Sequence, residues 1–246
     1  MNLTKNLLFA TATLLLLSFT LAQKKTTTIY IIGDSTAANK EAKAYPETGW
    51  GMEFQSFFKT DVKIDNRALN GRSTKSFRAE NRWRPIVDKL TPNDYVFIEF
   101  GHNDEKIDKP AVGTTIVEFK ANLVQYIKEA RAKKASPILL TPIARRNFKN
   151  GVLMDTHGDY PRAVKQVADS LNVPLIDMLA KTESLLIRLG DEKSIALFNH
   201  VEPGNQNYPE GKKDDTHLSP LGAKQVASLV ASGIKELKLN LAKKLK

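Results

Sequence analysis

The chain has 246 residues, of which 41% are hydrophobic and 26% are charged, a composition and length that suit one large core and, by default, one domain. It contains no cysteine, which excludes disulfides, zinc-thiolate sites and thiol catalysis. Its formal net charge is +10, and such a basic balance favours encounters with polyanions, either nucleic acid or acidic polysaccharide.

Residues 1–22 differ from the rest of the chain. Lys5 precedes an apolar run over residues 7–21, and small residues suited to cleavage stand at its end. This pattern predicts a secretory signal peptide that is removed after Ala22, with a single mature domain over residues 23–246. An uncleaved membrane anchor is the rival interpretation, but the run is short for a span and four hydroxyl side chains interrupt it. We therefore expect an exported protein, periplasmic or extracellular, without stable membrane association after cleavage.

The first predicted strand ends beside a candidate nucleophile. Residues 29–32 form a β-branched and aromatic run, which suits a strand buried on both faces of a parallel sheet. Gly33 ends the run, because glycine tolerates the backbone angles of a sharp exit. Ser35 is then expected at the N-terminus of a following helix, where free N–H groups and the helix dipole favour an oxyanion. Gly33-Asp34-Ser35 alone also fits an ordinary turn, so a base and oxyanion donors are needed elsewhere.

Polar residues also follow the next two predicted strands. Residues 62–69 alternate between apolar and polar side chains and end at Asn70-Gly71, a turn dipeptide where the Gly71 N–H can approach a ligand closely. Residues 94–100 are the most strand-like run in the chain, and they stop at Gly101-His102-Asn103-Asp104. Each polar group therefore stands where a buried strand is expected to end.

The remaining elements alternate between helix and strand. Helices are predicted over residues 49–59, from Ser73 or Thr74 to about residue 90, from Thr114 or Thr115 to about residue 134, over residues 160–171 and 177–189, and from Ser219-Pro220 onward; strands are predicted over residues 137–142 and 173–176. An arginine-rich loop at residues 144–147 and a long irregular segment at residues 190–214, a length typical of binding loops, complete the chain.

This alternation predicts an α/β fold, a three-layer α/β/α sandwich around a parallel sheet of about five strands. Ligands bind such sheets beyond the carboxyl ends of the strands. Ser35, Gly71 and the cluster at residues 101–104 are all predicted to lie there.

Four histidines are candidates for a base that activates Ser35: His102, His157, His200 and His217. His217 comes just before the last helix, and Asp214, three residues earlier, can turn back to accept its Nδ1–H. The ring Nε2 would then be free for the Ser35 hydroxyl. Asp215 falls on the other side of such a turn and is the weaker candidate, while Asp214 by itself also fits a helix or turn cap.

Three groups are candidate donors to an oxyanion: the N–H of Ser35, the N–H of Gly71 and the side-chain amide of Asn103. Each also has an ordinary interpretation, since asparagine is common in turns and glycine is permissive. Asp34, beside the nucleophile, is expected to fix the loop rather than react.

Together these residues resemble the SGNH (GDSL-type) hydrolase superfamily. Four blocks stand in the order of that family: Gly33-Asp34-Ser35, Asn70-Gly71, Gly101-x-Asn103-Asp104 and Asp214-x-x-His217. Five sequence segments, GDSTAA, GWG, NGRST, FGHND and DDTHLS, are similar to those of the rhamnogalacturonan acetylesterase branch of this superfamily. The resemblance implies a flavodoxin-like SGNH hydrolase fold and a serine carbohydrate acetylesterase that needs no metal or cofactor. It also implies that Ser35 is the nucleophile, His217 the base and later acid, and Asp214 its orienting carboxylate, with Ser35, Gly71 and Asn103 forming the oxyanion hole.

The same branch implies an acidic polysaccharide, acetylated pectin, as the substrate, and its galacturonate carboxylates suit the basic charge of the chain. The predicted substrate-binding residues are His102, Arg72, Arg78, Arg145 and Arg146, with solvated surface charge as the alternative for each. The basic residues are spread out without interleaved aromatic residues, which argues against nucleic acid as a partner. A monomer is the default expectation.

Three other functions compete with this hypothesis. Asp215-Thr216-His217 also fits the Asp-x-His of a metallophosphoesterase, but a convincing set of further ligands is missing. A non-catalytic glycan-binding protein is disfavoured because Ser35, His217 and Asp214 are all present. A lipase or thioesterase of the same superfamily needs an apolar trench, whereas residues 190–214 are mostly polar.

Overall fold

A sheet of five parallel strands forms the centre of the computed structural model, which describes residues 26–246. The strands are β1 (Thr27–Gly33), β2 (Val62–Asn66), β3 (Tyr95–Glu99), β4 (Ser136–Leu140) and β7 (Leu175–Ile176), in the spatial order β2-β1-β3-β4-β7. Every neighbouring pair is parallel, and Ile31 in the middle of the sheet is in register with Asn66 and Phe97. The predicted parallel sheet of about five strands is confirmed.

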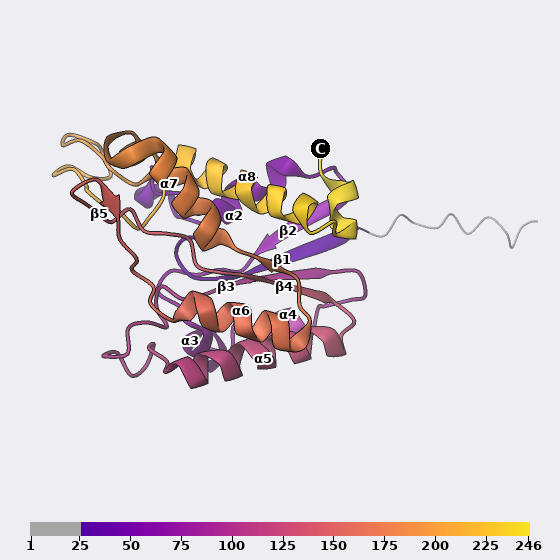
Figure 1. Cartoon of the computed structure of the whole chain (residues 1–246). Helices are drawn as coiled ribbons and strands as arrows, with labels where there is room; N and C mark the ends of the chain where they lie inside the picture. Colours follow the sequence, from indigo (N-terminus) through magenta and orange to yellow (C-terminus); the bar gives the residue numbers. More distant parts are fainter. Residues whose placement is uncertain (1–25) are drawn as a thin grey trace, which may run out of the picture.

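Helices cover both faces of the sheet, which gives three layers (Figure 1). One face carries α3 (Thr74–Ala79), α4 (Arg84–Val87), α5 (Ile116–Ala132) and α6 (Tyr160–Leu171), and the other carries α2 (Trp50–Glu53), α7 (Met178–Ser194) and α8 (Pro220–Glu236). Short 3-10 helices lie between these elements at η1 (Ala42–Ala44), η2 (Phe54–Phe57) and η3 (Ile195–Leu197), and η4 (Asn240–Lys244) follows α8 near the C-terminus. The predicted three-layer α/β/α sandwich is confirmed.

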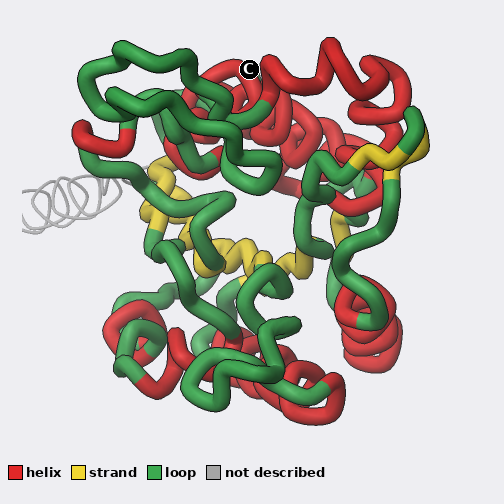
Figure 2. Tube along the Cα trace, turned by 90° about the vertical axis from the view of Figure 1, so that its left-hand side faces the viewer, coloured by secondary structure: helices red, strands yellow, loops and turns green. Residues whose placement is uncertain are grey.

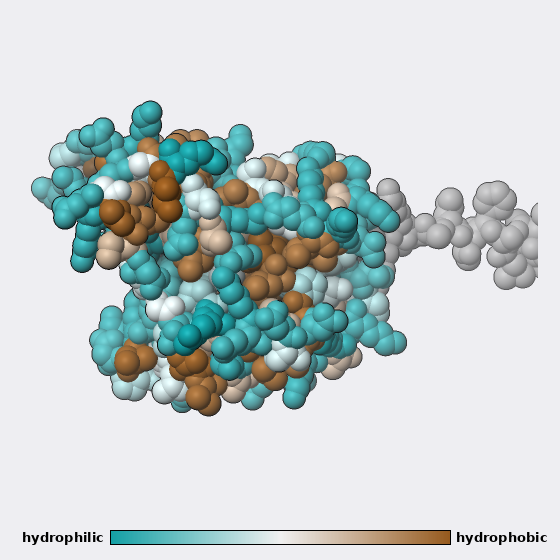
Figure 3. All heavy atoms as spheres, in the orientation of Figure 1, coloured by the Kyte–Doolittle hydropathy of each residue, from teal (hydrophilic) through white to brown (hydrophobic). Residues whose placement is uncertain are grey.

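The pleat of the strands divides the core in two. Along β1, Ile29 and Ile31 pack into the core that contains the apolar side of α8, whereas Tyr30 and Ile32 pack into the core that contains the apolar side of α5. Burial of each such apolar side chain contributes roughly 1.5–3 kcal/mol to the free energy of unfolding. On the face that Figure 3 presents, hydrophobic residues also gather between the two helical layers.

Hydroxyl side chains begin three of the helices. Ser73 and Thr115 each accept the N–H of the residue three positions later, and that residue's side chain binds the cap N–H in return. Ser219 Oγ accepts the N–H of Gly222 at 3.1 Å at the start of α8. These bonds satisfy donors that the first turn of a helix leaves unpaired. Of the alternatives weighed from sequence, Ser73 and Thr115 are the caps.

The predicted helix from residue 73 or 74 to about residue 90 is wrong, because the structure forms two short helices there. α3 ends at Ala79, Asn81 adopts a left-handed φ of 55°, and α4 begins at Arg84. Asparagine tolerates that region better than most residues do, so the chain can turn there. Pro85 stands in the first turn of α4, where its missing N–H costs nothing.

Two further helix boundaries differ from the predictions. The helix expected over residues 49–59 is α2 followed by η2, and it stops because Phe58 becomes extended and forms a bridge with Leu245. The helix expected to end at residue 189 continues to Ser194 across a kink at Gly190, whose φ is 74°.

A small antiparallel hairpin follows the arginine-rich loop and was not predicted. It consists of β5 (Phe148–Lys149) and β6 (Val152–Leu153). Asn150 and Gly151 connect the strands with φ values of 52° and 77°. Two consecutive positive φ angles are what a two-residue hairpin turn requires, and Asn-Gly is the sequence that favours them.

Loops gather where the strands of the sheet end. The strands run from right to left in Figure 1, and Figure 2 looks onto their carboxyl ends, where loops cover most of the molecule. The predicted signal peptide, residues 1–22, lies outside the described residues. Within residues 26–246, no helix combines the length and the apolar character that crossing a membrane requires.

Candidate active site

Ser35 is the second residue after β1, at the carboxyl edge of the sheet. Gly33, the last residue of β1, is needed for packing, because a Cβ there would lie 2.5 Å from the carbonyl oxygen of Glu99 on β3. Gly33 is not among the residues of positive φ in the described chain. Glycine is needed at position 33 because two strands approach closely there, and not because of unusual backbone angles as predicted from sequence.

The helix predicted to begin at Ser35 does not form. The Ala38 N–H donates to the Asp34 carbonyl at 3.1 Å, which closes a single turn. The next carbonyls, of Thr36 and Ala37, accept the N–H groups of Trp50 and Gly51 at 2.9 and 3.2 Å. Because α2 takes these acceptors, the turn does not continue as a helix that begins at Ser35.

The structure brings Ser35, His217 and Asp214 together. Ser35 Oγ lies 2.9 Å from His217 Nε2, although the two residues are 182 positions apart. His217 Nδ1 lies 2.8 Å from Asp214 Oδ2. This is the geometry in which a carboxylate orients an imidazole and the imidazole can take the proton of a hydroxyl.

The Asp214 carboxylate is held in place by backbone N–H groups of the residues that follow it. Its Oδ1 accepts the N–H groups of Thr216 and His217, both at 2.9 Å. Partial burial opposes ionisation, but the His217 ring and these N–H groups hold the pKa of Asp214 well below its usual range. The ionised carboxylate accepts the Nδ1–H, so His217 Nε2 carries the lone pair that faces Ser35.

Two of the three predicted oxyanion donors are unused by the protein. Within residues 26–246, neither the Ser35 N–H nor the Gly71 N–H donates to a protein group. Gly71 is exposed and has a φ of 77°, a left-handed conformation that favours glycine. Both N–H groups are therefore free to bind a ligand oxygen.

The amide of Asn103 is held in a fixed orientation. Its Nδ2 donates to the carbonyl of Arg72 at 3.1 Å, and its Oδ1 accepts the Lys106 ammonium at 2.7 Å. One N–H of the amide is thus used by the loop that carries Gly71, which leaves the second N–H for a ligand. The oxyanion role of Asn103 stays a prediction.

A buried hydrogen-bond network lies directly behind Ser35. Thr36 Oγ1 contacts Asp34 Oδ1 at 2.9 Å and Glu99 Oε1 at 3.2 Å, and Glu99 Oε2 accepts the Trp50 indole N–H at 2.6 Å. The Thr36 hydroxyl has a single hydrogen, so both contacts are satisfied when Glu99 is protonated and donates to Thr36. Asp34 also accepts the Thr36 N–H at 3.0 Å, so its carboxylate does fix this loop.

The ionisation of the two buried carboxyl groups follows from this network. Burial opposes ionisation of Asp34, but the His102 ring and the donors of Thr36 keep its pKa below the usual range. Burial and the Asp34 charge raise the pKa of Glu99 to about 8. Glu99 is therefore a neutral carboxylic acid at neutral pH.

Glu99 is expected to make the protein less stable as the pH rises. The unfolded chain loses the Glu99 proton near its ordinary pKa of 4.5, whereas the folded chain keeps it to about pH 8. The stabilising contribution of this proton is thus complete below about pH 4.5 and is lost as the pH rises to about 8. Thermal melting between about pH 5 and about pH 8 should show a larger fall in Tm for the unaltered protein than for Glu99→Gln, whose amide keeps both bonds without titrating.

The comparison with Glu99→Gln isolates this one group. Asp104, whose pKa burial raises to about 7, gives the same trend in both proteins and cancels in the difference. Parallel Tm curves for the two proteins would show that Glu99 does not titrate in this range.

The predicted substrate-binding arginines already have carboxylate partners. Arg72 binds Glu80 at 2.9 Å, Arg78 binds Glu129 at 2.8 Å, and Arg145 binds Glu105. Arg146 binds Asp191, and it also binds Asp215 at 2.8 Å. Contact of these side chains with a substrate stays a prediction, and a substrate carboxylate would have to share or replace the present partners.

His102, predicted from sequence to bind substrate, is buried in the structure. Its ring is buried, packs edge-on against His157 with 4.7 Å between ring centroids, and has Nδ1 3.5 Å from Asp34 Oδ2. Burial lowers the pKa of His102 to about 4, so the ring is neutral at pH 7. Contact of this ring with a substrate stays a prediction, and the ring would have to become more exposed to make it.

The Asp-x-His alternative also finds no support in the geometry. Asp215 Oδ1 lies 2.8 Å from His200 Nε2 and from Arg146, and its carboxylate is thus engaged away from His217. Among residues 26–246, no three histidine, aspartate or glutamate side chains are grouped so that they could hold a metal ion.

Comparison with known proteins decides the family. The sequence matches the GDSL-like Lipase/Acylhydrolase family over residues 31–225. The chain belongs to this family. It is accordingly an enzyme, a serine carboxylic ester hydrolase, and the resemblance to the SGNH (GDSL-type) superfamily is confirmed.

Relatives within the GDSL-like family cover almost the whole chain. Rhamnogalacturonan acetylesterase RhgT of Bacillus subtilis (strain 168) is 41% identical over 89% of this chain and 94% of the relative. YesY of the same strain, a probable rhamnogalacturonan acetylesterase, is 39% identical over 87% of this chain and 94% of the relative. The rhamnogalacturonan acetylesterase of Emericella nidulans is 30% identical over 92% of each chain.

Solved structures show the same fold. Protein YxiM of Bacillus subtilis superimposes with a TM-score of 0.75 at 24% identity, covering 87% of this chain and 58% of that chain. A catalytic mutant of the acetylxylan esterase Axe2 of Geobacillus stearothermophilus gives a TM-score of 0.62 at 22% identity, covering 85% of this chain and 94% of that chain. At these identities the likeness shows the fold alone.

Sequence reasoning missed two buried titratable side chains beside the nucleophile, those of Glu99 and Lys40. Glu99 is the one carboxyl group inside the apolar run at residues 95–100, and that exception was the available signal. Lys40 bonds the Ser35 carbonyl at 2.6 Å, and nothing in its local sequence indicates this. Both residues act on the turn that carries Ser35.

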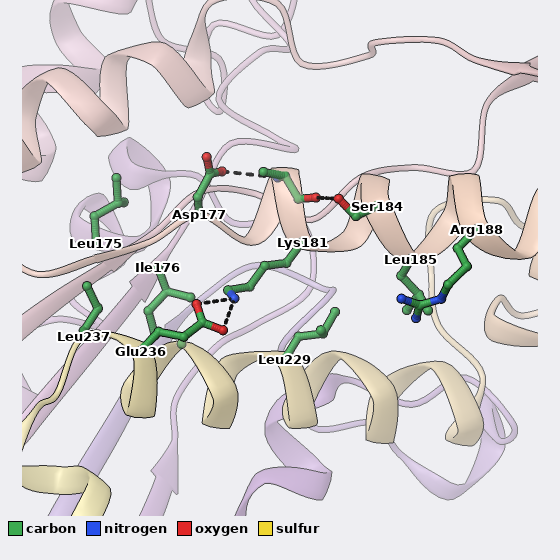
Figure 4. Close-up of a pocket in the computed structure, with 12 residues that line it drawn as sticks. Leu175, Ile176, Asp177, Lys181, Ser184, Leu185, Arg188, Leu229, Glu236 and Leu237 are labelled. Carbon is green, nitrogen blue, oxygen red and sulfur yellow. Dashed lines mark hydrogen bonds and ion pairs between the residues drawn. The ribbon is translucent and has the colours of Figure 1, made fainter.

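A separate cavity of about 510 Å³ lies between α7 and α8 (Figure 4). Lys181 reaches across it to Glu236 at 2.6 Å. None of the predicted site residues lines this cavity, so it is distinct from the candidate active site.

Proposed function

We propose that this esterase is an exported serine carbohydrate acetylesterase that removes acetyl groups from acetylated rhamnogalacturonan, an acidic pectin polysaccharide. The observation that carries the proposal is the hydrogen-bond series from Asp214 through His217 to Ser35, at 2.8 and 2.9 Å. The choice of substrate is supported by relatives at 41% and 39% identity whose names specify this activity. A named acetylxylan esterase is more distant, at 26% identity over 58% of this chain.

The first half of the reaction transfers the acetyl group to the enzyme. Ser35 Oγ attacks the acetyl carbonyl carbon while His217 Nε2 accepts the hydroxyl proton, and the Asp214 carboxylate stabilises the imidazolium that forms. The carbonyl oxygen becomes an oxyanion, which the N–H groups of Ser35 and Gly71 and the Asn103 amide receive. The bond to the sugar oxygen then breaks, the sugar oxygen takes the proton from His217, and acetyl-Ser35 remains.

The second half returns the enzyme to its starting state. A water molecule gives one proton to His217 Nε2 and attacks acetyl-Ser35, so that an oxyanion forms again in the same place. Collapse of this intermediate breaks the bond to Ser35 Oγ, which takes back the proton from His217. Acetic acid leaves with the second hydrogen of the water and ionises to acetate by giving that proton to the solvent, so the balance of atoms and charges requires no metal or redox partner.

The charge of the chain supports an anionic polymer as the substrate. The full chain has a formal net charge of +10, and removal of residues 1–22, whose one charge is Lys5, leaves +9. This positive charge attracts a galacturonate-containing polymer over distances of about a Debye length, roughly 8–10 Å at physiological salt. This attraction raises the local concentration of substrate without fixing which acetyl group is removed.

Acetate release from three polymers tests the substrate. Purified protein is expected to release acetate faster from acetylated rhamnogalacturonan than from acetylated xylan or acetylated homogalacturonan, by about 10-fold or more. Ser35→Ala supplies the background for each polymer. A higher rate on xylan would contradict the proposed substrate while leaving the esterase chemistry intact, and equal rates with and without Ser35 would contradict the chemistry.

A further inference from the structure

Lys40 is a buried ammonium next to the nucleophile. Its side chain is 2% exposed and lies between three acceptors: the Ser35 carbonyl at 2.6 Å, Asn70 Oδ1 at 2.7 Å and Glu47 Oε1 at 2.7 Å. An ammonium group has three hydrogens to donate, so these contacts use all of them. A buried charge is costly unless it is paired and hydrogen-bonded, and Lys40 satisfies both conditions.

The three acceptors belong to three different segments. Ser35 is in the turn after β1, Glu47 precedes α2, and Asn70 is in the loop after β2. Asn70 is the residue before Gly71, so Lys40 joins the peptide segments that carry two of the proposed oxyanion donors. The Lys40 ammonium thus bridges the turn after β1 and the loop after β2.

Side-chain packing does not hold Gly71 on the side where a Cβ would project, because a Cβ built there would meet no atom within 4 Å. Hydrogen bonds hold the loop instead: the Asn70 carbonyl accepts the Arg72 guanidinium at 2.7 Å, and the Asn103 amide donates to the Arg72 carbonyl at 3.1 Å. The bond from Lys40 to Asn70 Oδ1 adds a tether one residue from the Gly71 N–H, and among these bonds it is the one that links the loop to Ser35.

We propose that Lys40 is a positioning residue that fixes the Gly71 N–H relative to the Ser35 N–H, so that both donors reach the same oxyanion. This inference rests on the proposed function. Lys40 does not touch the substrate, because its side chain is buried and its three donors are engaged within the protein.

A purely structural role for Lys40 predicts a different outcome. If the ion pair with Glu47 serves only the fold, loss of Lys40 lowers Tm while kcat below the melting temperature stays the same. If Lys40 positions the donors, kcat falls and KM changes little. The reason is that the oxyanion forms in the transition state and the tetrahedral intermediate and is absent from the bound substrate. The split between kcat and KM therefore separates the two roles.

The direct test replaces Lys40 with methionine, an unbranched side chain without donors. With p-nitrophenyl acetate, Lys40→Met is expected to lower kcat about 10²–10³-fold, the loss typical of one oxyanion donor, with KM within about threefold of the unaltered value. The matched control is Lys181→Met, which breaks a lysine–glutamate pair across the α7–α8 cavity (Figure 4). This control should leave kcat unchanged.

A chemical rescue separates charge from packing. The chain has no cysteine, so Lys40→Cys introduces a single thiol. In denaturant its thiolate displaces bromide from 2-bromoethylamine, and the refolded product carries an ammonium at nearly the length of lysine. The same variant alkylated with 1-bromopropane carries a neutral chain of the same size. The unaltered protein, treated and refolded in parallel, gives the reference rate.

The outcomes of this experiment are distinct. Recovery of kcat with the aminoethyl group and not with the propyl group supports the proposal. A folded Lys40→Met protein with kcat within about threefold of the unaltered protein overturns it, as does equal recovery with both alkyl groups. Failure of the unaltered protein to hydrolyse p-nitrophenyl acetate would instead contradict the proposed function on which the inference rests.

Discussion

The Ser35→Ala protein is expected to hydrolyse p-nitrophenyl acetate at least about 10³-fold more slowly than the unaltered protein, because the attacking oxygen is gone. Folding should be retained. The substitution removes the side-chain hydrogen bond to His217, but the Ser35 carbonyl still accepts the Lys40 ammonium, because that bond does not involve the hydroxyl. Measurement of kcat/KM together with thermal melting checks both parts.

Ser170→Ala is the matched control for the loss of a hydroxyl. Ser170 is exposed on α6, and its Oγ bonds only to the carbonyl of Val167 in its own helix. This variant should keep the full rate. An unchanged rate in Ser35→Ala would remove Ser35 from the mechanism, whatever the control shows.

Asp214→Asn is expected to lower kcat by about 10³–10⁴-fold at neutral pH with little effect on folding. The asparagine oxygen can still accept the N–H groups of Thr216 and His217, so the local turn should survive. Its NH₂ group would then face His217 Nδ1 and favour the tautomer with the proton on Nε2. That tautomer cannot accept the hydroxyl proton of Ser35, so the pH–rate profile and kcat should both change.

Asp215→Asn provides a control in the adjacent residue. Asp215 bonds to His200 and Arg146 rather than to His217, so its loss should cost some stability and change kcat by less than about threefold. If the two variants lost activity equally, the orienting role would not belong to Asp214 alone.

The parallel sheet and the proximity of Ser35 to His217 could be predicted from sequence, because short sequence patterns indicate both. The β-branched run before Gly33 and the run over residues 94–100 set two central strands, and parallel strands bring the loops after them to one edge. Asp214 and His217 are three residues apart, so their pairing needs only one turn of backbone.

The rest depended on tertiary contacts that no local pattern records. Ser35 is followed by a turn rather than a helix because Trp50 and Gly51 take the carbonyls that a helix would use. His102 is a ring suited to carbohydrate contact by type alone, yet the fold buries it against His157. Lys40 has the appearance of a surface lysine in sequence, and only the arrangement of three loops makes it a bridge.

The separation of Ser35 from His217 along the chain has a consequence for biosynthesis. The hydroxyl is made 182 residues before the imidazole that contacts it, and the imidazole comes just before the last long helix. A ribosome that has completed four-fifths of the polypeptide therefore holds a serine without its proton acceptor. Under the proposed mechanism, hydrolysis requires the C-terminal segment to have been synthesised and docked, so a chain that ends before His217 is expected to be inert toward esters.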